Sequence, residues 1–73
     1  MYKYSNISSV EAQSVAIRAA GIASADFHEK NYYLKSGYGL YELDYSTDYM
    51  EYCCYINAET GEVVGFDCEP RVA

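Results

Sequence analysis

Residues 7–21 read ISSVEAQSVAIRAAG, and this stretch predicts the one helix around which the rest of the chain can be arranged. Ser8 can cap the helix, and the Glu11 side chain can reach back to the Ser8 amide, which makes a capping box. Ile7 and Ala12 have the spacing of a hydrophobic staple across the same end. The sequence therefore predicts a helix that begins at Ser9.

An apolar stripe continues from this start at helical spacing. Its members are Ala12, Val15, Ala16, Ala19 and Ala20. Gly21 follows the last of them and suits the left-handed position that ends a helix, with Ile22 placed to pack back on the final turn. The pattern predicts a helix over residues 9–20, with small side chains that let it lie close to another layer.

Beyond Gly21 the pattern changes to alternation, which is typical of strands. We expect strands over residues 26–34, 40–46, 49–57 and 62–68. The cluster at residues 36–39 predicts a turn. Residues 58–61, which end on Gly61, have the pattern of a type I turn closed by a left-handed residue.

Matching the apolar faces of these strands predicts how they pair. Between the last two strands the expected pairs are Ile56 with Val64, Cys54 with Phe66, and Tyr52 with Cys68. Between the two middle strands they are Tyr45 with Met50, Leu43 with Tyr52, and Tyr41 with Cys54. The helix stripe can then cover the inner face, so the sequence predicts a single α+β domain over residues 1–73, with one N-terminal helix packed on a three- to four-stranded antiparallel meander sheet.

The charge of the chain limits its partners. Eleven acidic residues against five basic ones give a formal charge of −6. Direct binding of nucleic acid needs Lys and Arg for the phosphates, so we expect none. A basic protein surface is compatible with this charge, and a plain solubility role explains it equally well.

The sequence predicts neither a membrane span nor a signal peptide. No apolar run approaches the ~20 residues that cross a bilayer, and the first six residues, MYKYSN, have no apolar core. This favours a cytoplasmic protein, or a fragment of a longer exported chain.

Several motifs together resemble the PepSY domain. They are the opening Ile7-Ser8-x-x-Glu11-Ala12, the alanine-rich helix that closes on Ala20-Gly21, the strand Tyr41-Glu42-Leu43, and the segment Ile56-Asn57-Ala58-Glu59-Thr60-Gly61-Glu62-Val63. The resemblance covers about residues 7–69; Asn57 stands where the family commonly has aspartate. It implies an extracytoplasmic or membrane-associated module that inhibits or regulates peptidases by binding them, with no catalytic residue.

The outer face of the predicted sheet holds the candidate partner-binding residues. These are Glu42, Asp44, Glu51, Tyr55, Asp67 and Glu69. The expected register places Asp44 directly opposite Glu51, and opposed like charges are destabilising. Such a face is either well solvated or kept for a cationic partner, with Tyr55 as an aromatic anchor.

No catalytic, cofactor or metal site is expected from the sequence. An open sheet face offers no pocket to raise a carboxyl pKa for acid and base catalysis, so we expect no enzyme. One histidine and no CxxC pair argue against structural zinc. Cys54 and Cys68 are expected to be buried free thiols, which only a shifted register or a bulge would bring into a disulfide, and Cys53 is expected to face outward.

Three functions remain open at this point. The first is a non-catalytic PepSY-like module that inhibits or regulates a peptidase or a neighbouring domain. The second is a free-standing acidic inhibitor, for example one encoded by a phage, that blocks a nucleic-acid-binding protein by mimicking phosphate charge. The third is a structural spacer in a longer chain. Oligomeric state is not predicted by the sequence.

Overall fold

The computed structural model describes residues 6–35 and 37–71, with the side chains of residues 29, 30 and 35 left out. Its elements are α1 (Ser9–Ala20), β1 (Asp26–Lys35), β2 (Tyr38–Ser46), β3 (Met50–Asn57) and β4 (Val63–Pro70). The four strands form one antiparallel sheet in the order β1-β2-β3-β4. The predicted α+β fold, with one N-terminal helix on a meander sheet, is confirmed.

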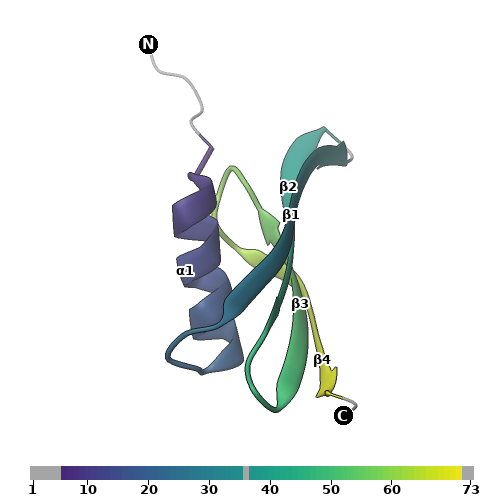
Figure 1. Ribbon diagram of the computed structural model, residues 1–73. Coiled ribbons are helices and arrows are strands. Elements are labelled where there is room, and N and C mark those ends of the chain that lie inside the picture. Colours follow the sequence, from purple (N-terminus) through teal and green to yellow (C-terminus); the bar gives the residue numbers. More distant parts are fainter. Residues whose placement is uncertain (1–5, 36, 72–73) are drawn as a thin grey trace.

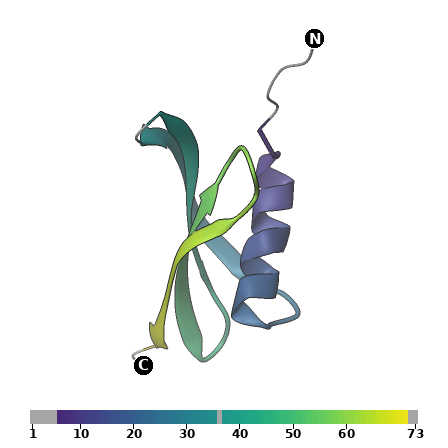
Figure 2. The same ribbon diagram turned by 180° about the vertical axis from the view of Figure 1, so that it is seen from behind.

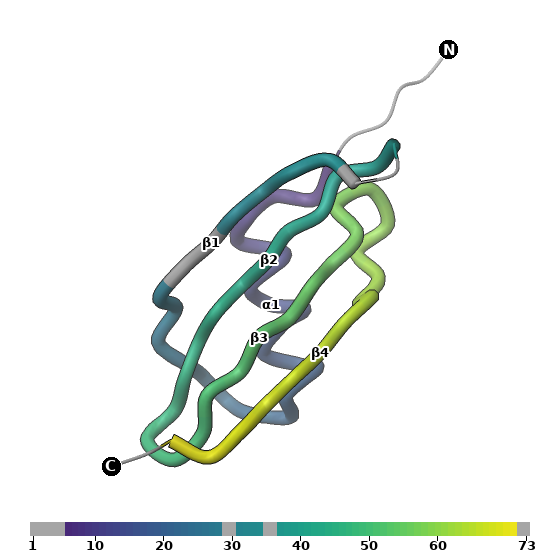
Figure 3. Tube along the Cα trace, turned by 90° about the vertical axis from the view of Figure 1, so that its right-hand side faces the viewer, coloured from purple at the N-terminus to yellow at the C-terminus, as the bar shows by residue number. Residues whose placement is uncertain are grey.

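Helix α1 lies against one face of the sheet and leaves the other face open (Figures 1 and 2). Viewed onto the open face, α1 lies behind the strands, and β1 and β4 form the two edges (Figure 3). The helix has 12 residues, and in the part of the chain described here no helix is long and apolar enough to cross a membrane.

Both ends of α1 are capped as the sequence predicts. The Ser8 hydroxyl accepts a hydrogen bond from the Glu11 amide at 3.1 Å, and the Glu11 carboxylate accepts one from the Ser8 amide at 2.9 Å. Gly21 takes the left-handed conformation at φ 70°, and the amides of Gly21 and Ile22 donate to the last carbonyls of the helix. These contacts satisfy end groups that would otherwise lack partners.

The buried core joins α1 to the two central strands. Its members are Ala12, Ala16, Leu43, Tyr45, Cys54 and Ile56. Tyr45 is 1% exposed, and its hydroxyl donates to the carbonyl oxygen of Ala16 at 2.7 Å. The small alanines therefore allow the helix to approach closely enough for a strand side chain to bond to its backbone.

A row of aromatic rings crosses all four strands on the helix-facing side. Phe27 stacks on Tyr45 at 4.9 Å between ring centroids, Tyr45 stacks on Tyr52 at 5.2 Å, and Tyr52 lies 6.1 Å from Phe66. We call these four rings the aromatic row. Offset ring pairs at such separations add stabilisation beyond the area that they bury.

The predicted register between β2 and β3 is wrong by two residues. Tyr45 pairs with Tyr52, Leu43 with Cys54 and Tyr41 with Ile56. A slip of two residues keeps every side chain on its face, so burial alone could not distinguish the two registers. The turn decides between them: the Thr47 amide donates to the Met50 carbonyl oxygen at 2.9 Å, which takes Met50 out of the pairing with Tyr45.

Between β3 and β4 the pairs Cys54–Phe66 and Tyr52–Cys68 are confirmed, whereas Ile56 pairs with Val63 instead of Val64. The register shifts between Tyr55 and Ile56, which leaves Val64 as an extra residue in β4, the signature of a β-bulge. Because β4 is an edge strand, Val64 is 49% exposed and Phe66 41% exposed, although both were expected in the covered inner face.

The turns follow the sequence closely. Gly61 has φ 79°, and its amide donates to the Asn57 carbonyl oxygen at 2.7 Å. The Asn57 side-chain oxygen accepts from the amides of Glu59 and Thr60 at 2.8 and 3.2 Å. In the turn expected at residues 36–39, Gly37 has φ 86° and β2 already begins at Tyr38, while Ser36 lies outside the described residues.

Candidate functional site: the open acidic face of the sheet

The open face contains a depression of about 400 Å³ above β2, β3 and β4. The outward-facing residues that line it are His28, Asp44, Glu51, Cys53, Asp67 and Glu69. Four of the six predicted partner-binding residues are therefore brought together here. We call this depression and the adjoining Glu42 and Tyr55 the acidic face.

Cross-strand pairing sets the order of the carboxylates on this face. Glu51 lies opposite Glu69, and Cys53 lies between Asp44 on one neighbouring strand and Asp67 on the other. The expected opposition of Asp44 and Glu51 is wrong, because the two-residue shift places Cys53 opposite Asp44 and Ser46 opposite Glu51. The like-charge pair is instead Glu51 with Glu69, which costs some tenths of a kcal/mol.

Tyr55 and Glu42 adjoin the depression and interact with each other. They are opposite one another in the β2–β3 register, and the Tyr55 hydroxyl donates to the Glu42 carboxylate at 3.2 Å. Hydrogen bonding with Cys53 and the nearby charge of Glu42 raise the pKa of Tyr55. Tyr55 is therefore held neutral, as a hydrogen-bonding aromatic group beside the carboxylates.

Cys53 faces outward as predicted, but its surroundings suppress its reactivity. Burial, and then hydrogen bonding with Asp44, raises the pKa of Cys53 from its ordinary 9.0 to about 11, against a smaller opposite effect of Tyr55. At neutral pH the thiol is protonated, and the thiolate is the nucleophilic form.

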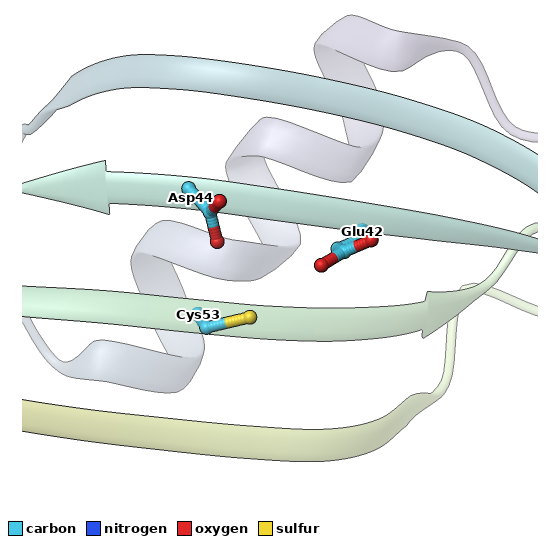
Figure 4. A group of neighbouring side chains, drawn as sticks. All are labelled: Glu42, Asp44 and Cys53. Atoms are coloured by element: carbon cyan, nitrogen blue, oxygen red, sulfur yellow. The ribbon is translucent and has the colours of Figure 1, made fainter.

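Glu42, Asp44 and Cys53 form a cluster whose ligand atoms all lie within 4.8 Å of one another (Figure 4). Two carboxylates and a thiol are groups that hold divalent metal ions in proteins, provided the thiol loses its proton. The sequence analysis considered only cysteine and histidine spacing and missed this cluster. Alternation on β2 together with the true β2–β3 register would have found it.

His28 is a second residue that the sequence analysis did not assign to the site. A register shift in β1 between Phe27 and Glu29 turns its side chain onto the open face, where Nε2 lies 2.6 Å from the Ser46 hydroxyl. The bulge is defined by the pairing of β1 with β2, so no local pattern in the sequence of β1 identifies it.

Neither of the two arginines that the structure describes lines the depression. Arg18 is on α1, and the Arg71 guanidinium donates to the Thr47 carbonyl oxygen at 2.8 Å. The carboxylates of the face therefore present their charge to solvent.

The three cysteines are free thiols. Cys54 is buried as expected, but the prediction that Cys68 is buried is wrong, because β4 lies at the edge of the sheet and exposes Cys68.

Comparisons with protein-family models, curated proteins and solved structures gave no match to this chain. The PepSY resemblance therefore rests on the quoted motifs alone.

Proposed function

We propose that this domain is a non-catalytic protein-binding module whose acidic face binds a basic surface of a partner protein. The observation that carries the proposal is the open depression of about 400 Å³ lined by Asp44, Glu51, Asp67 and Glu69. Four carboxylates on one face create a negative potential that attracts a cationic partner and raises its association rate. In keeping with the PepSY resemblance, the partner is a peptidase or a neighbouring domain, which the module inhibits or regulates.

A second candidate follows from the same carboxylates. On β2 (Glu42 and Asp44) and on β4 (Asp67 and Glu69) they recur at every second residue, about 7 Å apart along a strand, and neighbouring strands lie about 5 Å apart. A regular array of negative charge is what a phosphate mimic needs in order to occupy a nucleic-acid-binding protein. Both candidates require a basic partner and differ in which protein supplies it.

Binding of a labelled nine-residue lysine-rich peptide tests the common requirement. The variant Glu51→Gln/Glu69→Gln removes two charges from the acidic face, and the control Glu59→Gln/Glu62→Gln removes two exposed charges from the β3–β4 connection. Both changes reduce the net charge equally. We expect the first variant to weaken binding at least tenfold and the second less than twofold, with affinity falling as salt rises.

Equal losses in the two variants would mean that net charge alone attracts the peptide, and the acidic face would have no special role. Capture from envelope and lysate fractions then separates the two candidates. A peptidase lost in Glu51→Gln/Glu69→Gln supports the regulatory module, and a nucleic-acid-binding protein lost in the same variant supports the mimic.

A further inference from the structure

The edge strand β4 ends the aromatic row without a neighbour. Phe66 contacts Tyr52 on its inner side but is 41% exposed, whereas Tyr45 in the middle of the row is 1% exposed. The row could extend to one more ring or aliphatic side chain only if a further strand lay beside β4. The edge at β4 is visible in Figure 3, where no other segment of the described chain flanks it.

The two edges of the sheet differ in how they discourage strand addition. Edge strands are commonly protected by lysines and by bulges. Both edge strands have a register shift, β1 between Phe27 and Glu29 and β4 at Val64, but only the sequence of β1 contains lysines, Lys30 and Lys35. Strand β4 has no lysine, and from Gly65 to Glu69 it pairs with β3 in regular register. The segment available for pairing with an added strand is therefore Gly65–Glu69, five residues long. It ends before Pro70, which has no amide to donate.

Alternation gives this segment two chemically distinct sides. Phe66 and Cys68 point to the face of the aromatic row, and Asp67 and Glu69 point to the acidic face. An added strand must alternate in the same way, because successive side chains of a strand point to opposite faces. Its residues beside Phe66 and Cys68 should be apolar, and those beside Asp67 and Glu69 should be basic.

We infer that β4 binds an extended peptide segment of a partner protein in which apolar and basic residues alternate, by adding it as a fifth strand. The inference rests on the proposed function, because it names the form in which the basic partner reaches the acidic face. Main-chain hydrogen bonds to β4 supply affinity, and the alternating side chains supply specificity.

Charge complementarity selects such a segment over a second copy of this chain. In an antiparallel β4–β4 pair centred on Cys68, Asp67 would oppose Glu69 of the other copy, and each copy carries a formal charge of −6. Opposed like charges destabilise a strand pair, whereas opposite charges stabilise it. A basic strand is favoured both by its opposed charge pairs with Asp67 and Glu69 and by its attraction to the net negative charge of the chain.

Titration of the full chain with a seven-residue capped peptide of sequence KVKFKVK tests this inference. The control peptide, KKKKVVF, has the same composition in block order. Two further versions of KVKFKVK are N-methylated at every second amide, one at the odd positions and the other at the even positions. The two sets differ because the amides of a strand point alternately to its two edges. We expect the alternating peptide to bind at least tenfold more tightly than the block peptide. One N-methyl set should abolish binding, and the other should change it less than threefold.

Two protein variants locate the site. Phe66→Ser should weaken binding of the alternating peptide at least fivefold, whereas Leu34→Ser, at the β1 edge and 72% exposed, should leave it unchanged. The amides of residues 65–69 that face away from β3 should gain hydrogen-exchange protection when the peptide is bound.

The failures of the two proposals are distinguishable. If all four peptides bind equally and Glu51→Gln/Glu69→Gln weakens them all, the acidic face binds basic chains but β4 adds no strand, and the inference is overturned alone. If no basic peptide binds, both proposals fail. If the β4 amides are protected in the free protein and the protection grows with its concentration, a second copy occupies the edge and the inference is also overturned.

Discussion

Removing the Tyr45 hydroxyl should measure how firmly the helix is fixed to the sheet. In Tyr45→Phe the ring keeps its contacts with Phe27 and Tyr52, at 4.9 and 5.2 Å between centroids, and the hydrogen bond to the Ala16 carbonyl oxygen is lost. A typical hydrogen bond contributes about 0.5–1.5 kcal/mol net, and an acceptor left without its partner in a buried site costs about 1–3 kcal/mol. Since Ala16 is fully buried, we expect the free energy of unfolding to fall by about 1–2 kcal/mol.

Urea unfolding followed by far-ultraviolet circular dichroism measures this change, with the slope against urea concentration unchanged if only stability is altered. A loss of this size lowers Tm by roughly 4–16 °C in a domain of this length. Tyr49→Phe is the matched control, because Tyr49 is 80% exposed, and it should change stability by less than about 0.5 kcal/mol. If the two variants were equally stable, the buried hydroxyl would contribute nothing, and the reasoning would be refuted.

Three further measurements follow from the site and the turns. At pH 8, iodoacetamide should alkylate Cys53 roughly tenfold more slowly than a thiol of ordinary pKa 9.0, because the raised pKa of about 11 lowers the thiolate fraction more than it raises the nucleophilicity of the thiolate. Mass spectrometry of the modified peptide should show a faster reaction in Asp44→Asn. An unchanged rate in that variant would contradict the role of Asp44. The free energy of unfolding should fall as pH rises above about 9, because the pKa values of Cys53 and Tyr45 are raised in the folded state and only the unfolded chain releases those protons. In Tyr45→Phe the fall above pH 10 should be shallower. An equal slope in the variant would show that Tyr45 does not contribute to the pH dependence. Asn57→Ala should cost about 1 kcal/mol in thermal unfolding by removing the oxygen that caps the β3–β4 turn, whereas Asn57→Asp keeps that acceptor and should cost less.

The local elements were predictable because their causes are local. The capping box at Ser8 and Glu11, the left-handed Gly21 and the left-handed Gly61 each depend on residues within a few positions, and all three are as predicted. Alternation also assigned Glu42, Asp44 and Cys53 to the outer face, because a register slip of two residues leaves that assignment unchanged.

The sequence could not supply the relative position of the strands. Burial does not distinguish registers that differ by two residues, so the hydrogen bonds of the Thr47–Met50 turn decided that Cys53 lies opposite Asp44. The bulges at His28 and Val64 depend on pairing across the sheet. The first places His28 in the acidic face, and the second pairs Ile56 with Val63 instead of Val64.

The amino-acid sequence by itself therefore determined the elements, their faces and the excess of acidic charge, because propensity, capping and period-two burial act over a few residues. Only the tertiary structure decided which carboxylates share a depression, that Cys53 joins Glu42 and Asp44, and that Phe66 and Cys68 lie exposed on an open edge. Those outcomes depend on contacts between residues far apart in the chain, and the register that sets them is chosen by turns and packing rather than by the apolar pattern alone.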